Sequence, residues 1–202
     1  LGHWFASEPV FGVVPDMIIF AKGVTSGYLP LGGFVVSEGL LNQVSGPAAN
    51  GNIFSTGYTW SANPVSCSAA LAVWEIIERE QILEHVRGVS GYFLEQLNTL
   101  TALPLVREVR GQGLMAAIDL MPPADLLSGS ALDQDYALGD LVDECCYARG
   151  LIVRPLINVC VISPPLIITR AQIDELVEKF RAGIEAAAIE LSRRYPCTDE
   201  SL

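Results

Sequence analysis

The first half of the chain combines two short apolar runs with two long helical periodicities. Residues 17–21 (Met-Ile-Ile-Phe-Ala) are continuously apolar, with Pro15 and Asp16 before them and a Gly/Thr/Ser loop after them. This pattern predicts a strand buried on both faces, as in a parallel α/β sheet. Residues 33–37 predict a second strand, and residues 46–52, rich in Gly, Pro and Asn, predict an exposed loop.

Two helices are expected after this loop. The first begins with Asn63 as its N-cap and Pro64 at the first helical position, where the missing N–H of proline costs nothing. The second covers about 85–100, where apolar residues recur every three or four positions, at Val86, Val89, Phe93 and Leu97. Two or three strands do not make a covered parallel sheet, so residues 1–103 are interpreted as part of a larger α/β domain.

Residues 104–202 have the pattern of a compact second domain. Its expected elements are strands within 106–120, a loop at 122–130, a helix at 137–149 capped by Gly150, strands at 151–154 and 159–162, and a helix at 170–194. The last helix carries its apolar residues on one face, at Ile173, Leu176, Val177, Phe180 and Ile184. The order ββαββα predicts a small α+β layer domain.

The composition is that of a globular, acidic protein. Half of the 202 residues are hydrophobic, 17% are charged, and 23 acidic against 12 basic residues give a formal net charge of −11. An acidic chain lacks the basic face that binds nucleic acid or an anionic membrane surface. No apolar run reaches the roughly 18 residues that span a bilayer. We therefore expect neither nucleic acid nor a membrane as a partner.

The cysteines suggest neither disulfides nor a metal centre. The chain has an odd number of them, without a Cys-x-x-Cys pair: Cys67, Cys145, Cys146, Cys160 and Cys197. This favours free buried thiols in a reducing cytoplasm. The two histidines are far apart in sequence and suggest no metal site.

Lys22 is the residue whose position points to chemistry. Of the two lysines, Lys179 lies on the last amphipathic helix and is interpreted as a solvated surface charge. Lys22 follows the apolar strand directly and precedes Gly23, at the carboxyl end of a strand, where α/β proteins build ligand sites. A desolvated amine at such a place can attack a carbonyl group. On spacing alone, the alternative is a lysine that merely leaves the sheet and extends into solvent.

Five blocks, in order and across almost the whole chain, carry a resemblance to one family. They are residues 15–33 around Lys22, 57–72 (beginning Gly-Tyr-Thr-Trp-Ser-Ala-Asn-Pro), 110–115 (Arg-Gly-Gln-Gly-Leu-Met), 150–155 (Gly-Leu-Ile-Val-Arg-Pro) and 163–166 (Ser-Pro-Pro-Leu). Together they resemble the C-terminal half of class III (omega-type) pyridoxal-phosphate aminotransferases. The resemblance implies a fold type I architecture. Residues 1–103 would be the C-terminal part of the large α/β cofactor-binding domain, with a connecting helix, and 104–202 the small α+β domain.

The resemblance also implies the cofactor and the reaction. In the family, the lysine of the first block forms a Schiff base with pyridoxal 5′-phosphate and later moves a proton between the substrate α-carbon and the cofactor C4′. Lys22 matches that lysine. The cofactor supplies the electron sink, and the protein positions it. The implied activity is a ping-pong transfer of an amino group from an amine or ω-amino acid to a keto acid such as pyruvate.

Three consecutive residues of the second block match family positions near the cofactor. Thr59 matches the threonine that hydrogen-bonds the cofactor phosphate, usually in the neighbouring subunit's site, and Tyr58 lies beside the same phosphate. A shared site implies a homodimer. Without the resemblance, Thr59 is interpreted as a hydroxyl that caps the turn before Asn63. Trp60 is expected to form a wall of the pocket, with plain packing in the turn as its alternative.

Arg154 matches the family arginine that binds the substrate carboxylate. A guanidinium grips a carboxylate with two hydrogen bonds, which a lysine cannot reproduce. In the family this arginine can swing away to admit neutral amines. The alternative is an arginine on an edge strand that simply faces solvent.

The acid that a pyridoxal-phosphate enzyme places on the pyridine nitrogen is missing from these blocks. Asp16 fails on geometry, because six residues of extended strand put it roughly 20 Å from Lys22. In the family that aspartate precedes a Gly-Arg-Thr-Gly segment, whose last glycine Gly2 resembles. The aspartate would then lie upstream of Leu1. We therefore expect a fragment that lacks the N-terminal half and is a poor catalyst by itself.

Two other functions remain open on the sequence. Class III enzymes also include decarboxylases, aminomutases and racemases, and all of them share the lysine that Lys22 matches. A different class of function is a non-catalytic truncated domain that serves only in dimerisation or interaction.

Overall fold

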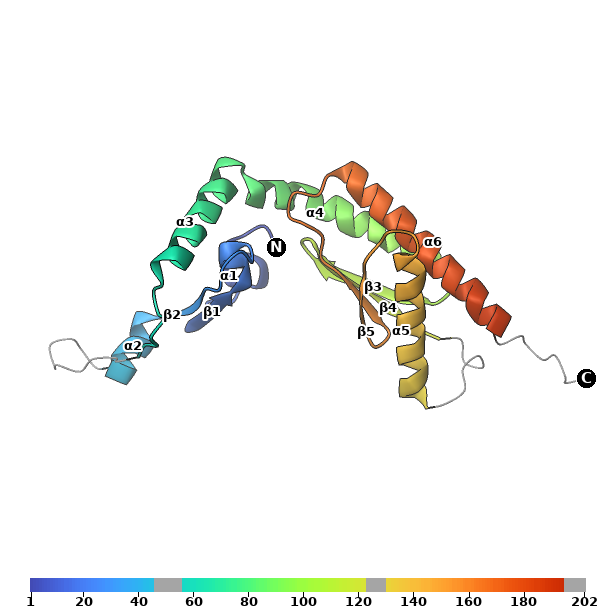
Figure 1. The fold of residues 1–202 in the computed structure, drawn as a ribbon, viewed down its shortest axis with the longest axis horizontal. Helices are drawn as coiled ribbons and strands as arrows, with labels where there is room; N and C mark the ends of the chain where they lie inside the picture. The colour runs from blue at the N-terminus through green and yellow to red at the C-terminus, as the bar shows by residue number, and fades with distance from the viewer. Residues whose placement is uncertain (46–55, 123–129, 195–202) are drawn as a thin grey trace, which may run out of the picture. The chain divides into compact units, whose positions relative to one another are not determined.

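The computed structural model describes residues 1–45, 56–122 and 130–194. The chain divides into two compact units, residues 3–83 and residues 84–202 together with Leu1 and Gly2 (Figure 1). The predicted loop at 46–52, and nearly all of the one at 122–130, lie outside the described residues. The division expected near residue 103 stays a prediction for the whole protein. By packing, helix α4 (Ile82–Asn98) belongs from Glu84 onward to the C-terminal unit.

The C-terminal unit has the predicted ββαββα order. After α4 and a 3-10 turn, η3 (Thr99–Ala102), its elements are β3 (Val106–Gln112), β4 (Met115–Leu120), α5 (Ala131–Tyr147), β5 (Arg154–Leu156), β6 (Val159–Ile162) and α6 (Arg170–Arg194). The four strands form one antiparallel sheet in the order β3-β4-β6-β5. The expected helix at 170–194 is confirmed.

The strand expected at 151–154 is wrong in its bounds, because β5 begins only at Arg154. Leu151 closes the last turn of α5 instead of opening the strand. The amide of Leu151 donates to the carbonyl of Cys146 at 3.0 Å, and Gly150 has a φ of 75°, which closes the helix with a left-handed residue. Gly150 therefore closes the turn after the helix, but the expected bounds 137–149 are wrong, because α5 runs from Ala131 to Tyr147 with Ser130 as its N-cap.

One face of the sheet packs against the helices and forms the core. Its buried residues are Ala116, Ile118 and Leu120 of β4 and Cys160 and Ile162 of β6. The helices contribute the apolar residues predicted for α4 (Val86, Val89, Phe93, Leu97) and four of the five predicted for α6 (Ile173, Val177, Phe180, Ile184). Leu176 is only partly buried against this core. The helical periodicities therefore identified the core correctly.

The opposite face of the sheet carries charged groups. The strand register aligns Arg154, Val161, Ala117 and Arg110 in one row across all four strands. Asp119 lies two residues beyond Ala117 on β4. Neighbours in a cross-strand row, and residues two apart on a strand, share a face. Arg110, Asp119 and Arg154 therefore lie on the face away from the helices.

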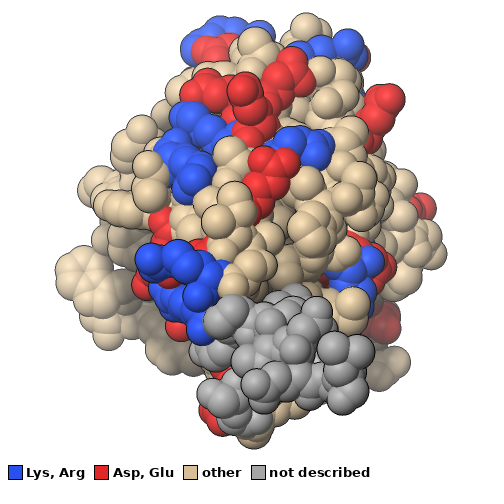
Figure 2. All heavy atoms as spheres, turned by 90° about the vertical axis from the view of Figure 1, so that its right-hand side faces the viewer, with Lys and Arg blue, Asp and Glu red and all other residues tan. Residues whose placement is uncertain are grey.

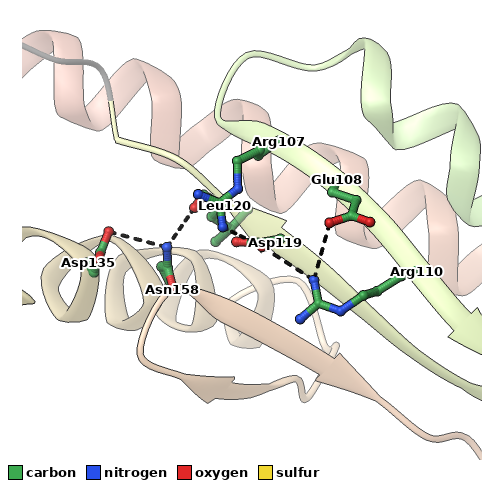
Figure 3. Close-up of polar contacts among 7 residues, drawn as sticks. All are labelled: Arg107, Glu108, Arg110, Asp119, Leu120, Asp135 and Asn158. Carbon is green, nitrogen blue, oxygen red and sulfur yellow. Dashed lines mark hydrogen bonds and ion pairs between the residues drawn. The ribbon is translucent and has the colours of Figure 1, made fainter.

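Asp119 is the centre of an ion-pair cluster on this face (Figure 3). Its Oδ2 accepts from Arg107 Nη2 at 2.6 Å and from Arg110 Nη1 at 3.3 Å, and Asp119 is only 4% exposed. The register of β3 shifts between Val106 and Glu108, so Arg107 and Arg110 can both reach the same carboxylate. Arg110 also lies 3.6 Å from Glu108, which pairs directly opposite Asp119. The arginines thus separate two like charges.

Asn158 extends this cluster to the helix layer. Its amide donates to the carbonyl of Leu120 at 2.9 Å and to Asp135 Oδ1 at 3.2 Å (Figure 3). One side chain therefore joins the turn before β6 to β4 and to α5. The same cluster raises the pKa of Arg107, chiefly through its hydrogen bond to Asp119.

The N-terminal unit consists of α1 (Ser7–Phe11), β1 (Met17–Ala21), η1 (Lys22–Thr25), β2 (Gly32–Val36), α2 (Glu38–Ser45) and α3 (Pro64–Arg79). Both predicted strands are present. The parallel pairing and burial on both faces are wrong for β1, which pairs antiparallel with β2 and alternates between exposed and half-buried residues. A run of apolar residues is the same in a strand that is buried on both faces and in a strand whose covering layer is not among the described residues. The sequence pattern could therefore not distinguish the two.

Helix α3 begins as predicted. The Oδ1 of Asn63 accepts from the amides of Val65 at 3.0 Å and Ser66 at 3.4 Å, and Pro64 occupies the first turn. The residues at the start of the helix were therefore sufficient to predict where it begins.

Farther along the helix, Trp74 packs its ring 5.6 Å from that of Trp4.

The surface mixes charges of both signs. Figure 2 shows basic and acidic side chains side by side on one face, with uncharged areas between them. Glu190 on α6 pairs with Arg193 and Arg194, both at 2.8 Å, and these contacts lower the pKa of its carboxyl to about 2. None of the described helices is long and apolar enough to cross a membrane.

The four described cysteines are free thiols. Cys67 and Cys145 are partly exposed, whereas Cys146 and Cys160 lie in the core, where burial raises the pKa of each thiol to about 12. Cys197 lies outside the described residues.

The ion-pair cluster predicts an asymmetry between two neighbouring acids. Asp119→Asn should lower the free energy of unfolding by about 1–2 kcal/mol, because two half-exposed arginines lose one buried partner. Glu108→Gln, which removes an exposed acid beside the same Arg110, should cost at most about 0.5 kcal/mol. Urea unfolding followed by circular dichroism measures both values. Equal losses would show that burial of Asp119 contributes nothing.

The buried thiols predict selective labelling. At pH 8 a thiol whose pKa is about 12 is ionised only about once in ten thousand molecules, and iodoacetamide reacts with the thiolate. Cys67 should therefore be alkylated about a hundredfold or more faster than Cys146 and Cys160 in the folded chain. Peptide mass spectrometry over time, with a urea-unfolded sample as the control, measures the ratio. Comparable rates in the folded chain would contradict the burial of the two core thiols.

Candidate active site

Lys22 stands at the point where β1 ends and the chain turns. The strand ends at Ala21, and Lys22 begins the single 3-10 turn η1. Its backbone φ is 52°, in the left-handed region that residues with a side chain rarely adopt. The side chain is exposed. The strand thus delivers the lysine to its carboxyl end, as the sequence predicted.

Thr25 holds the turn that follows Lys22. It is fully buried, and its hydroxyl donates to the carbonyl of Leu29 at 2.6 Å. The amide of Gly27, whose φ of 80° suits glycine, donates back to the carbonyl of Lys22 at 3.2 Å. These contacts fix the backbone that follows the lysine without using its amine.

The segment before α3 forms a second tight turn. The amide of Tyr58 donates to the hydroxyl of Ser61, and the amide of Ser61 donates to the carbonyl of Tyr58, both at 2.9 Å. Ala62 has a φ of 55°, and Asn63 then caps α3. The turn is therefore fixed by its own hydrogen bonds, and it presents Tyr58, Thr59 and Trp60 as exposed side chains.

The two turns line one hollow of about 820 Å³. Of the residues predicted from the sequence, Lys22, Tyr58 and Trp60 all contribute to its wall. Tyr28 also lines it, and sequence reasoning missed this residue although it lies in the block around Lys22. The volume lies within the range of small-molecule sites. Residues more than thirty positions apart in the sequence thus surround one cavity.

Backbone strain is concentrated at this hollow. Six described residues other than glycine have a positive φ. Three of the six are Lys22, Ser26 and Ala62. Lys22 and Ala62 line the hollow directly. Such conformations cost about 1–3 kcal/mol each and gather at functional sites. The strain therefore supports a functional reading of this cavity.

The described residues that line the hollow include a single charged side chain. Lys22 is the one cationic side chain among the described residues that line it, and no acid is among them. Asp16 lies at the other end of β1, where the hydroxyl of Ser37 donates to its Oδ1 at 3.4 Å. Asp16 is therefore engaged away from Lys22, in agreement with its exclusion on strand geometry.

Thr59 is not part of this lining, although its neighbours Tyr58 and Trp60 are. Its side chain is exposed. Since Thr59 does not line the hollow around Lys22, its hydroxyl is available to bind a group outside that hollow.

Arg154 belongs to the other compact unit and is described by itself. It opens β5, pairs across from Val161, and lines a pocket of about 790 Å³ between the β5–β6 edge and the start of α6. The wall is mostly apolar, with Ser163, Thr169 and Gln172 as its polar members. Arg154 is exposed and forms part of this wall, so the pocket pairs one guanidinium with apolar surroundings.

A flat aromatic aldehyde fits these features. The hollow offers an exposed primary amine, three aromatic side chains (Tyr28, Tyr58 and Trp60) that can flank a ring, and a volume sufficient for it. Among the described residues, no group of three or more His, Cys, Asp or Glu side chains is placed to hold a metal ion. The hollow thus pairs one primary amine with aromatic walls.

Comparison with known proteins agrees with this arrangement. Residues 1–184 match the family model "Aminotransferase class-III". The putrescine–pyruvate aminotransferase of Pseudomonas aeruginosa is 36% identical over 188 residues, which are 93% of this chain and 40% of that protein. The omega-aminotransferase of Caulobacter vibrioides is 34% identical over 182 residues, which are 90% of this chain and 39% of that protein. The chain thus spans about 40% of the length of these relatives.

Solved structures share the fold. The (S)-enantioselective omega-transaminase of Thermomicrobium roseum matches with a TM-score of 0.78 and 34% identity, over 92% of this chain and 40% of that one. The omega-transferase of Vibrio fluvialis JS17 matches with a TM-score of 0.81 and 29% identity, over 95% of this chain and 45% of that one. The predicted fold class, part of a fold type I transaminase, is confirmed. The chain belongs to the class III aminotransferase family.

Proposed function

We propose that these residues form the lysine-bearing part of a pyridoxal-phosphate-dependent aminotransferase. It would transfer an amino group from an amine or ω-amino acid to a keto acid such as pyruvate, in a ping-pong reaction. The observation that carries the proposal is the hollow in which Lys22, Tyr58 and Trp60 meet. Relatives named as a putrescine–pyruvate aminotransferase and an omega-aminotransferase support the substrate class. The free thiols fit a cytoplasmic protein.

Pyridoxal 5′-phosphate, when bound, supplies the electron sink for chemistry at the substrate α-carbon. Lys22 would hold it through its amine and, once released, carry a proton at Nζ between donor and acceptor atoms. The hydrogen bonds of Thr25 and Gly27 keep the lysine backbone in place while its side chain moves. Trp60 would form a wall of the pocket and exclude water from it, and Tyr58 would lie beside the phosphate that Thr59 binds.

Thr59 and Arg154 complete the proposed set. The exposed Thr59, which does not line the hollow around Lys22, suits a phosphate in the site of a second subunit, so we propose a homodimer. Arg154 would bind the substrate carboxylate through its guanidinium, and the apolar wall around it would hold the carbon chain. The limited span favours a second candidate, a non-catalytic module, because these residues cover only about 40% of the length of the P. aeruginosa relative.

Lys22 should be the site of cofactor attachment. After mixing with pyridoxal phosphate and reduction with borohydride, the mapped adduct should lie on Lys22, and Lys22→Ala should abolish it. Lys179→Ala is the matched control, since Lys179 is held by Glu175 at 2.7 Å on α6. An adduct mainly on Lys179 or the N-terminus would reject the proposed role and favour the non-catalytic module.

Thr59 should recognise the phosphate rather than the ring. Thr59→Ala should weaken pyridoxal phosphate binding by about tenfold or more, because a hydrogen bond to a charged group contributes about 1.5–3 kcal/mol. Binding of pyridoxal, which has no phosphate, should not change. Titration by the visible absorbance of each aldehyde measures both affinities. A loss for both ligands would assign Thr59 to the turn instead.

A further inference from the structure

His85 contacts the wall of the Arg154 pocket from behind. Its Nε2 lies 2.9 Å from the carbonyl oxygen of Ile168, which is 83 residues farther along the chain. His85 is half-buried near the start of α4, and Ile168 is buried in the core of the same unit. Ile168 lines the pocket, whereas His85 does not. The histidine therefore acts on the pocket only through its wall.

This contact requires a donor at one position and does not require a charge. A carbonyl oxygen can only accept a hydrogen bond, so Nε2 of His85 carries the proton. A neutral ring with its proton on Nε2 and a protonated ring both donate from that atom. The length of the side chain is thus what allows His85 to reach Ile168.

The wall in question is the loop of residues 163–169, which joins β6 to α6. Two of its seven residues are adjacent prolines, which have no amide to donate. The amide of Ile168 donates to the carbonyl of Pro165 at 3.0 Å, and the amide of Thr169 donates at 2.9 Å to a side chain of α6. Within the described part of the chain, only His85 bonds this loop to α4.

Arg154 is positioned in a different way from this loop. Its backbone is held by strand pairing, since it lies across from Val161 in the sheet. Pro165 and Ile167 of the loop line the same pocket as Arg154 and supply part of its apolar wall. A carbon chain packs well only against a wall at contact distance, so a small displacement of the loop weakens the packing. The sheet thus places the guanidinium, and the contact with α4 places the loop.

We propose that His85 is a positioning residue for the binding of carboxylate substrates. Through its hydrogen bond to Ile168, it holds the loop where the apolar wall packs against the carbon chain of a carboxylate on Arg154. It touches neither the substrate nor the reacting atoms. The proposal rests on the function proposed for Arg154 and adds to it a residue of α4.

The test compares side chains of different reach at position 85. Pentanoate, an aliphatic carboxylate without an amine, is titrated into the full chain, and its affinity is measured from the NMR shifts of the loop amides. His85→Asn keeps an amide but is too short to reach the Ile168 carbonyl, so it should bind pentanoate about tenfold more weakly. His85→Gln carries its amide nitrogen about as far from the backbone as Nε2 and should restore the affinity to within about twofold.

Arg181→Met is the matched control. Arg181 joins α6 to η3 through the hydroxyl of Thr99 at 2.8 Å, and it does not line the pocket. Its replacement should leave the pentanoate affinity unchanged. Hydrogen exchange at the Ile168 amide, measured without ligand, should become about tenfold faster in His85→Asn but not in His85→Gln or Arg181→Met.

Weaker binding and faster exchange in His85→Asn, both restored in His85→Gln, support the proposal. Unchanged exchange in His85→Asn, faster exchange without weaker binding, or no restoration in His85→Gln overturns it. An equal loss of affinity in Arg181→Met also overturns it, because the effect would then come from a general loss of stability.

Arg154→Leu separates this proposal from the function proposed for Arg154. If the unaltered chain does not bind pentanoate, or if Arg154→Leu binds it equally well, the carboxylate site is rejected and the role of His85 falls with it. Binding that depends on Arg154 but not on His85 rejects the role of His85 alone.

Discussion

Burial of one sheet face beneath α4, α5 and α6 is the interaction on which the C-terminal unit depends. The apolar positions of β4 and β6 alternate with residues of the outer face, so the same strands that build the core also align Arg154 with Arg110 across the sheet. The ion pairs around Asp119 neutralise the charges that this arrangement brings together. A stable core therefore also fixes the face on which the proposed carboxylate-binding arginine stands.

In the N-terminal unit, local hydrogen bonds rather than a buried sheet face order the described turns. It contributes the amine, the aromatic walls and two tight turns that are held by local hydrogen bonds, and among its described residues only Ala70 is a buried apolar residue. The two turns are thus held in place by their own hydrogen bonds. The groups proposed to carry the chemistry are thus positioned by local contacts rather than by a hydrophobic core.

Sequence patterns predicted well wherever the cause was local. The capped start of α3 at Asn63, the closing turn after α5 at Gly150 and the apolar faces of α4 and α6 each follow from neighbouring residues. The pairing of β1 was not predictable in this way, because an apolar strand reads the same whether its neighbour is parallel or antiparallel. The start of β5 was misplaced because residues 151–153 are apolar like a strand, whereas the amide of Leu151 bonds back to the last turn of α5 and the sheet pairing begins only at Arg154.

By itself, the sequence determined the family, the lysine and the residues expected around it, since these depend on motifs whose order the chain preserves. Tertiary structure alone decided that Lys22, Tyr28, Tyr58 and Trp60 line one hollow and that Thr59 does not. It also decided that Asp119 is buried between two arginines. These facts depend on how distant turns and strands meet in space, which the spacing of residues along the chain does not specify.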